Sequence, residues 1–304
     1  MTIFHRLNRW QEQARITPEQ YRTLTALAHK SPFSVYLELN VLLYVGVVAI
    51  VGGLGWTIQT YAHQLGNAAI LLGLTTLLVG CLFYCFTQTP NLLFDYVLYL
   101  GCLSWSLELG YIEKQFHVLN AQWDLYLFIT SLLYFALAYR FDNRFVLSMA
   151  ITALGSWFGV KVMHVFLSQP EAYRSSAILY GVVLLSAGLG FDVAGIKKHF
   201  TGTYLNFAAN VIFVAVLSGV WLSGVLSMWT VGLLLAMGCS LFYGLKTQQF
   251  AFVAYAAVYG YLGVSSLFVR HIDNYSIVLV YFLCSGIGMM IFLTWLARNF
   301  GKES

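Results

Sequence analysis

The feature of this sequence that most limits its fold is a series of apolar stretches, each long enough to cross a bilayer as a helix. Only 9% of the 304 residues are charged, whereas a soluble domain carries roughly 25%. So few charges cannot cover a surface that faces water, and lipid must surround most of the chain. We therefore expect an all-α membrane protein, because a helix satisfies its own backbone hydrogen bonds inside lipid.

The stretches predict ten transmembrane helices, since about 20 apolar residues cross a ~30 Å hydrocarbon core. The spans are expected near residues 36–60, 66–86, 92–112, 121–139, 144–167, 175–195, 201–222, 226–244, 249–270 and 274–297. An even number of spans puts both ends of the chain on the same side. The domain organisation expected is a unit over residues 1–33 and a membrane domain over residues 34–304.

Lysines and arginines predict the orientation, because they gather in cytoplasmic loops. With the N-terminus in the cytoplasm, twelve of the sixteen are cytoplasmic, and the four outside are Lys114, Lys161, Arg174 and Arg270. Both termini are therefore expected in the cytoplasm. This bias also accounts for the net charge of +4, so the charge does not indicate a nucleic-acid partner.

The N-terminal segment predicts a helical hairpin. Residues 2–14 place Ile3, Leu7 and Trp10 on one helical stripe. Thr17 can cap a second helix, Pro18 suits its first position, and Gln20 can complete a capping box. The hairpin is too small to hold a core, so we expect it against the membrane surface or the bundle. It would anchor the topology or, alternatively, dock a protein partner.

Three motifs at the N-terminus carry a family resemblance: RW at 9–10, ITPEQ at 16–20 and LNVLLYVG at 39–46. Together they resemble a family of bacterial inner-membrane proteins known only as a domain of unknown function. Its members join a short "W…I-T/S-x-E-Q" cytoplasmic segment to a region of several spans. The resemblance covers about the first sixty residues. It implies a bacterial inner membrane and many helices, and it supplies no catalytic residues.

A possible internal repeat suggests that the sequence has two similar halves. YVGVVAIVGGLGW at 44–56 aligns with YGVVLLSAGLGF at 180–191 at an offset of 135 residues. The first span leaves the cytoplasm and the sixth re-enters it, so residues 36–167 and 175–298 would form a five-plus-five inverted repeat. Transporters often follow this plan. The alternative is chance, because membrane helices reuse few residue types.

Ionisable residues gather in the outer half, where buried charges are expensive and are candidates for function. Glu108 is expected about one turn below the outer end of its span, and Lys161 and His164 in the last turns of theirs, with Asp124 nearby. Glu108 and Lys161 could form a buried ion pair under a polar rim. Alternatively, these residues form a periplasm-facing pocket for a polar or charged substrate, or relay protons through Glu108 and His164.

Two amides, Asn206 and Asn210, share a face of the seventh span and must find partners away from lipid. Hydrogen bonds between helices would satisfy them. The alternative is that they line a polar cavity, together with Tyr255, Tyr259 and Tyr261.

Motifs for cofactor or metal chemistry are not found. The sequence has no phosphate-binding glycine loop, no metal-ligand spacing and no nucleophile elbow, so we expect neither a metal nor a cofactor. The five cysteines lie in apolar runs and suit packing.

Three functions remain open. The first is a transporter or flippase for a small polar or lipid-linked molecule, with Asn206 and Asn210 along the path and Glu108 with Lys161 as an outer gate or coupling pair. The second is a non-catalytic membrane subunit that docks a partner. The third is an enzyme at the outer leaflet, with Glu108, His164 and Asp124 as acid–base residues. An enzyme is expected less than the other two.

Overall fold

A computed structural model describes residues 10–11, 17–29, 36–89, 93–118, 123–166, 170–223, 227–270, 272 and 274–300. Within these residues the chain is helical, and no strand occurs. The helices are α2 (Pro18–His29), α3 (Tyr36–Leu65), α4 (Asn67–Thr87), α5 (Phe94–Phe116), α6 (Trp123–Phe141), α7 (Arg144–Phe166), α8 (Pro170–Val193), α9 (Thr201–Ser223), α10 (Met228–Thr247), α11 (Phe250–Val269) and α12 (Tyr275–Asn299). A short 3₁₀ turn, Lys198–Phe200, precedes α9.

The ten long helices α3 to α12 lie where the ten spans were predicted. Seven of them are both long and apolar enough to cross a membrane: α3, α4, α6, α8, α9, α10 and α12. The other three differ in composition or in described length. Helix α5 carries Asp95, Glu108, Glu113 and Lys114, the side chains of α7 are described only as far as Lys161, and the described apolar part of α11 is short. The structure therefore confirms a polytopic helical membrane protein.

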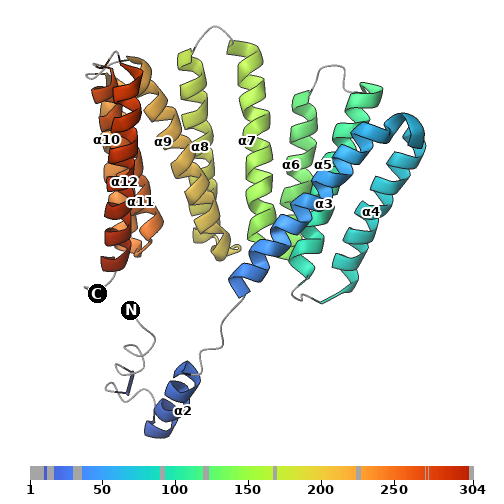
Figure 1. The fold of residues 1–304 in the computed structure, drawn as a ribbon, viewed down its shortest axis with the longest axis horizontal. Helices are drawn as coiled ribbons and strands as arrows, with labels where there is room; N and C mark the ends of the chain where they lie inside the picture. The colour runs from blue at the N-terminus through green and yellow to red at the C-terminus, as the bar shows by residue number, and fades with distance from the viewer. Residues whose placement is uncertain are drawn as a thin grey trace.

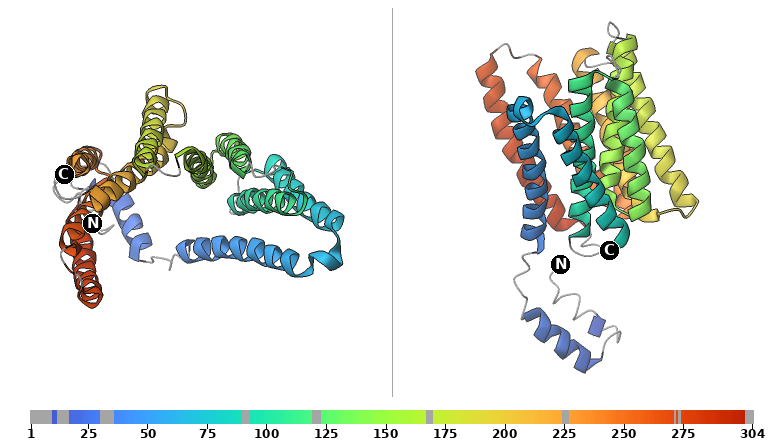
Figure 2. Two further views of the ribbon diagram at one scale, coloured as in Figure 1. Left: turned by 90° about the horizontal axis from the view of Figure 1, so that it is seen from above. Right: turned by 90° about the vertical axis from the view of Figure 1, so that its right-hand side faces the viewer.

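The long helices run alternately up and down, so the start of α3 and the end of α12 lie at the same end of the bundle (Figure 1). We call this end, which holds Tyr36 and Asn299, the terminal end. The other, which holds Leu65 and Tyr275, is the far end. Seen from above, the helices form a curved row that ends at α12, and α3 crosses beside α4 and α5 (Figure 2).

Antiparallel hairpins build the row, because α4 packs on α5, α6 on α7, α8 on α9 and α10 on α11. The main buried cluster runs from α4 to α9 and includes Leu98, Cys102, Leu147 and Ile151, all at most 1% exposed. A second cluster centres on Phe213 and Leu233, between α9 and α10. Helix α12 has no buried residue in its described length.

The inverted repeat is not confirmed. A repeat would equate α3 and α4 with α8 and α9. Helices α8 and α9 pack closely along each other, whereas α3 and α4 diverge and α3 packs mainly on α5 (Figure 1). Likewise, α6 packs closely on α7, while α11 and α12 make little contact. Gly is common where membrane helices approach closely, and Val and Leu are common throughout such helices, so the shared residues need not indicate a common packing.

The start of α2 matches the capping prediction. The backbone N–H of Gln20 donates to Thr17 Oγ1 at 3.2 Å, and the N–H of Thr17 donates to Gln20 Oε1 at 3.0 Å. This reciprocal pair satisfies two backbone donors that the first helical turn leaves open. The first helix expected in the hairpin, over residues 2–14, lies largely outside the described residues.

Candidate functional site

A polar pocket lies between α3, α4 and α5 at the far end. Its cavity of about 360 Å³ is lined by Gly55, Ile58, Gln59, Ala62, Asn67, Ser106, Leu107, Gly110, Tyr111, Lys114 and Gln115. Amides, a phenol and an ammonium group therefore surround one space in a chain that is otherwise mostly apolar. Such convergent polar groups are typical of a site for a small ligand.

Local sequence explains how the pocket forms. Gly66 is the single residue between α3 and α4, and its φ of 75° is a conformation that glycine adopts readily. The two helices diverge from this turn, and α5 lies against both of them. The Tyr111 hydroxyl donates to Asn67 Oδ1 at 2.9 Å, which joins α5 to the start of α4.

Hydrogen bonds from α6 hold the other side of α5. The Tyr134 hydroxyl lies 2.5 Å from the Cys102 carbonyl oxygen and 2.6 Å from Ser106 Oγ. The Tyr126 hydroxyl donates to the Ser106 carbonyl oxygen at 2.5 Å. Ser106 lines the pocket, so these tyrosines fix one wall of it from outside.

Glu108 lies deeper than predicted. Helix α5 continues to Phe116, so the carboxyl is about 12 Å from the far end of its helix at a 1.5 Å rise per residue. The side chain is buried, and the Thr75 hydroxyl of α4 donates to Glu108 Oε1 at 2.5 Å. Glu108 Oε2 is buried and has no hydrogen-bond partner among the described residues.

The predicted Glu108–Lys161 pair is wrong, because Lys161 pairs with a different acid. Lys161 Nζ lies 2.6 Å from Asp124 Oδ2. Asp124 begins α6 and Lys161 is near the end of α7, and these two helices pack closely against each other. Glu108 instead contacts α4. The described part of His164 does not include its side chain, so its predicted role lies outside what the structure describes.

Asn206 and Asn210 both bond to α11. The Tyr255 hydroxyl donates to Asn206 Oδ1 at 3.2 Å, and the Tyr259 hydroxyl donates to Asn210 Oδ1 at 2.9 Å. Asn210 Nδ2 also donates to the Asn206 carbonyl oxygen at 2.8 Å. These contacts fit the expected hydrogen bonding between helices, and a role in a substrate path stays a prediction.

Cavities near the middle of the row are mostly apolar. One of about 350 Å³ lies between α8, α9, α10 and α11, and its walls include Leu185, Ile212, Phe213 and Phe252. Such walls suit lipid chains better than a polar solute. The described cavities therefore place the strongest polar grouping at the far end, beside α5.

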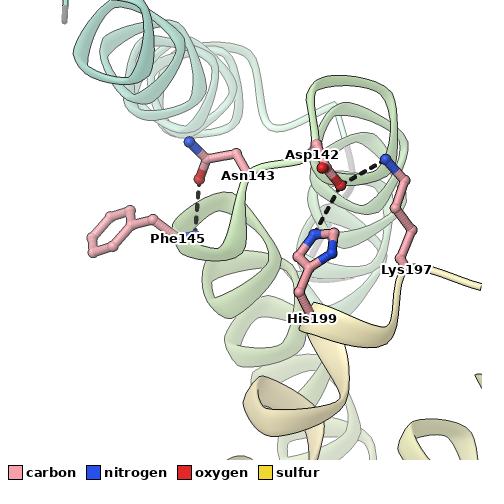
Figure 3. Close-up of polar contacts among 5 residues, drawn as sticks. All are labelled: Asp142, Asn143, Phe145, Lys197 and His199. Atoms are coloured by element: carbon pink, nitrogen blue, oxygen red, sulfur yellow. Dashed lines mark hydrogen bonds and ion pairs between the residues drawn. The ribbon is translucent and has the colours of Figure 1, made fainter. Parts of the chain in front are cut away.

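The terminal end holds a second polar cluster, which ties two connections together (Figure 3). Asp142 Oδ1 lies 2.6 Å from Lys197 Nζ and 2.9 Å from His199 Nε2, so it links the α6–α7 and α8–α9 connections. The hydrogen bond from Lys197 holds the pKa of Asp142 below its ordinary value of 3.8. Because folding lowers this pKa, the ionised carboxylate stabilises the folded protein at pH values above 3.8. This stabilisation is lost as the pH falls through the lowered pKa of the folded state. The side chain is half exposed, so this is a surface contact of small energy.

Sequence reasoning missed Gln59, Asn67, Thr75, Tyr111 and Gln115. Each is near a span end or is a common residue in membrane helices, so nothing in its own position marks it. The available signal was two amides, Gln59 and Asn67, on either side of the short connection at Gly66.

Comparison with known proteins places the first part of the chain. Residues 8–147 match the model of a family described as Predicted membrane protein (DUF2157). Searches of curated proteins and of solved structures each found no significant match. The matched residues run from before α2 into α7 and contain the whole polar pocket. The resemblance seen at the N-terminus is thus confirmed, and over residues 8–147 the chain fits a family of predicted membrane proteins of unknown function.

Proposed function

We propose that this protein is a carrier in the bacterial inner membrane that binds a small polar solute in the pocket between α3, α4 and α5. All ten helices α3 to α12 cross the membrane in this proposal, and the terminal end faces the cytoplasm. The excess of Lys and Arg at the terminal end supports that orientation. The far end, with the mouth of the pocket, then faces outward.

The observation that carries the proposal is the set of polar groups around one cavity. Gln59 and Gln115 offer amide donors and acceptors, and Lys114 offers a positive charge near the mouth. Among the described charged residues, only Lys114 lines this cavity. A small solute that carries a carboxylate or phosphate beside hydrogen-bonding groups fits these walls best.

A second candidate function is favoured by α12. Its described residues are unburied, and it makes few contacts with the rest of the bundle. A non-catalytic membrane subunit would cover such a helix with a partner. The enzyme alternative loses support, because Glu108 and Asp124 have different partners on different helices.

Ligand-dependent stability tests the carrier proposal. Purified protein in detergent would be heated with L-glutamate, L-lactate, inorganic phosphate or, as a neutral comparison, glucose. Binding raises the free energy of unfolding by about 2.7 kcal/mol at a hundredfold excess of solute over Kd, and the unfolding midpoint rises with it. We expect an anionic member of this set to stabilise the protein, and Lys114→Gln to weaken its binding several-fold, for a loss of about 1 kcal/mol at an exposed lysine.

The matched control is Lys198→Gln, an exposed lysine at the terminal end. It should bind the same solute as the wild type does. The proposal fails if none of these solutes stabilises the protein, or if the Lys114 and Lys198 variants behave alike.

A further inference from the structure

The carboxyl of Glu108 is buried in the membrane region without a cation. Its residue is 8% exposed, and its one hydrogen bond in the described structure comes from Thr75. Among the described residues, every ion pair lies elsewhere, and Lys161 is held by Asp124. Glu108 Oε2 therefore faces the protein interior with no donor or cation against it.

An ionised carboxylate in this place is expensive. Placing a charged side chain at the centre of a membrane helix costs about 2.5–3.5 kcal/mol on insertion scales. One hydroxyl donor offsets only part of that cost, because the second oxygen remains unpaired. Adding a proton to Oε2 removes the charge, while Oε1 still accepts the bond from Thr75.

The surroundings of Oε2 suit a neutral acid. Ser104 lies one turn away on the same face of α5, is fully buried, and its Oγ also has no described partner. The Ser104 hydroxyl therefore donates nothing to Oε2, and a carboxylate in this place would lack a second donor. The described residues contain no cluster of three or more His, Cys, Asp or Glu side chains, so the groups in view favour a proton over a metal ion.

We propose that Glu108, held by the Thr75 hydroxyl, binds and releases one proton within the membrane. The role of this site in coupling protons to transport rests on the proposed function. The described part of α4 brings no charged group to the site. On its own helix, α5, the nearby titratable groups are Tyr111, Glu113 and Lys114. On the neighbouring helices they are Tyr61 of α3 and Asp124, Tyr126 and Tyr134 of α6.

Infrared spectroscopy of the protein in lipid vesicles tests this site without any solute. The spectrum of Glu108→Gln would be subtracted from that of the wild type at each pH from about 5 to about 9, the range that buried carboxyls reach. We expect the carbonyl band of a neutral carboxyl at low pH and carboxylate bands at high pH. The midpoint should be the same in sodium chloride and in choline chloride.

Two threonine variants sharpen the result. Thr75→Val removes the donor to Glu108, which stabilises the ionised form more than the neutral form, so proton affinity should rise roughly tenfold. Thr76→Val is the control, because Thr76 is exposed and donates to the Leu72 carbonyl oxygen. It should leave the midpoint unchanged.

Three results would overturn the inference: carboxylate bands at every pH, a neutral-acid band that never titrates, or a midpoint set by sodium. Each is independent of solute binding. If Glu108 titrates but none of the solutes stabilises the protein, the carrier proposal alone is refuted. If a solute stabilises the protein but Glu108 does not titrate, the proton site alone is refuted.

Discussion

Gly219→Ala is expected to destabilise the protein by roughly 1–3 kcal/mol, the usual cost of overpacking a well-filled interior. A Cβ at this position of α9 would lie 2.4 Å from Trp229 Cδ2 and 2.5 Å from Trp229 Cγ. Cγ is attached directly to the tryptophan Cβ, so the ring cannot rotate clear without moving α10. The Trp229 ring also supports the Arg174 guanidinium, 5.4 Å from its centroid, and that contact would be disturbed too.

The measurement is the unfolding midpoint in detergent, compared with Gly238→Ala. Gly238 lies on α10, and a Cβ there would meet no atom within 4 Å. Alanine favours a helix by up to about 1 kcal/mol over glycine, so this control should be neutral or stabilising. Equal midpoints for the two variants would mean that α9 and α10 are not packed as closely as described.

Asn143→Ala is expected to cost roughly 2 kcal/mol, because one side chain serves three bonds. Asn143 Oδ1 accepts from the backbone N–H of Phe145 at 2.8 Å (Figure 3). It also accepts from the backbone N–H of Val146 at 2.9 Å, and together these bonds cap α7. Its Nδ2 donates to Asp95 Oδ1 at 2.8 Å and so ties α7 to the start of α5. The side chain is buried, so water replaces these bonds poorly.

Asn143→Ser separates the two contributions. Serine can still cap α7 but cannot reach Asp95, so its unfolding midpoint should lie between those of the wild type and the alanine variant. An alanine variant as stable as the wild type would show that the cap and the bond to Asp95 contribute nothing measurable.

The sequence predicted the elements well because their signals are local. The positions of the ten long helices followed from the length of each apolar run, and the Thr17–Gln20 capping box followed from spacing alone. Glycine also lets α11 approach its neighbours closely: a Cβ at Gly260 would lie 2.4 Å from Met237 Cε, and one at Gly263 would lie 2.5 Å from Leu233 Cδ2. By contrast, a Cβ at Gly52 or Gly53 on α3 would meet no atom within 4 Å.

Pairing between distant residues could not be predicted, because the sequence does not say which helices are neighbours. Glu108 and Lys161 have opposite charges and were predicted at similar depth, yet α6 supplies Asp124 to Lys161 and α4 supplies Thr75 to Glu108. The depth of Glu108 was underestimated for a related reason. Glu113, Lys114 and Gln115 indicate a span end by polarity, but they favour helix strongly and α5 continues through them.

The pocket depends on shape as much as on residue type. Gln59, Asn67 and Tyr111 lie on three helices, and only the divergence of α3 and α4 after Gly66 leaves space between them. No single position on the sequence marks such a space. Its polar character could be anticipated only as a general excess of polar residues in the outer half.

The central claim is that the pocket belongs to a carrier, and two-sided access to Ser106 tests it most directly. Ser106 lines the pocket about 15 Å from the far end of α5, by the rise per residue. Ser106→Cys would be made after replacement of the five native cysteines, with Val118→Cys and Lys198→Cys marking the far and terminal sides. A membrane-impermeant maleimide would then be applied from each side in turn.

A carrier predicts that Cys at position 106 reacts from both sides, while each marker reacts from one side only. Reaction from both sides requires that the pocket open alternately to the two faces of the membrane. Reaction from the far side alone would contradict the carrier and leave a binding pocket closed at its base. No reaction from either side would mean that the pocket is not open to water.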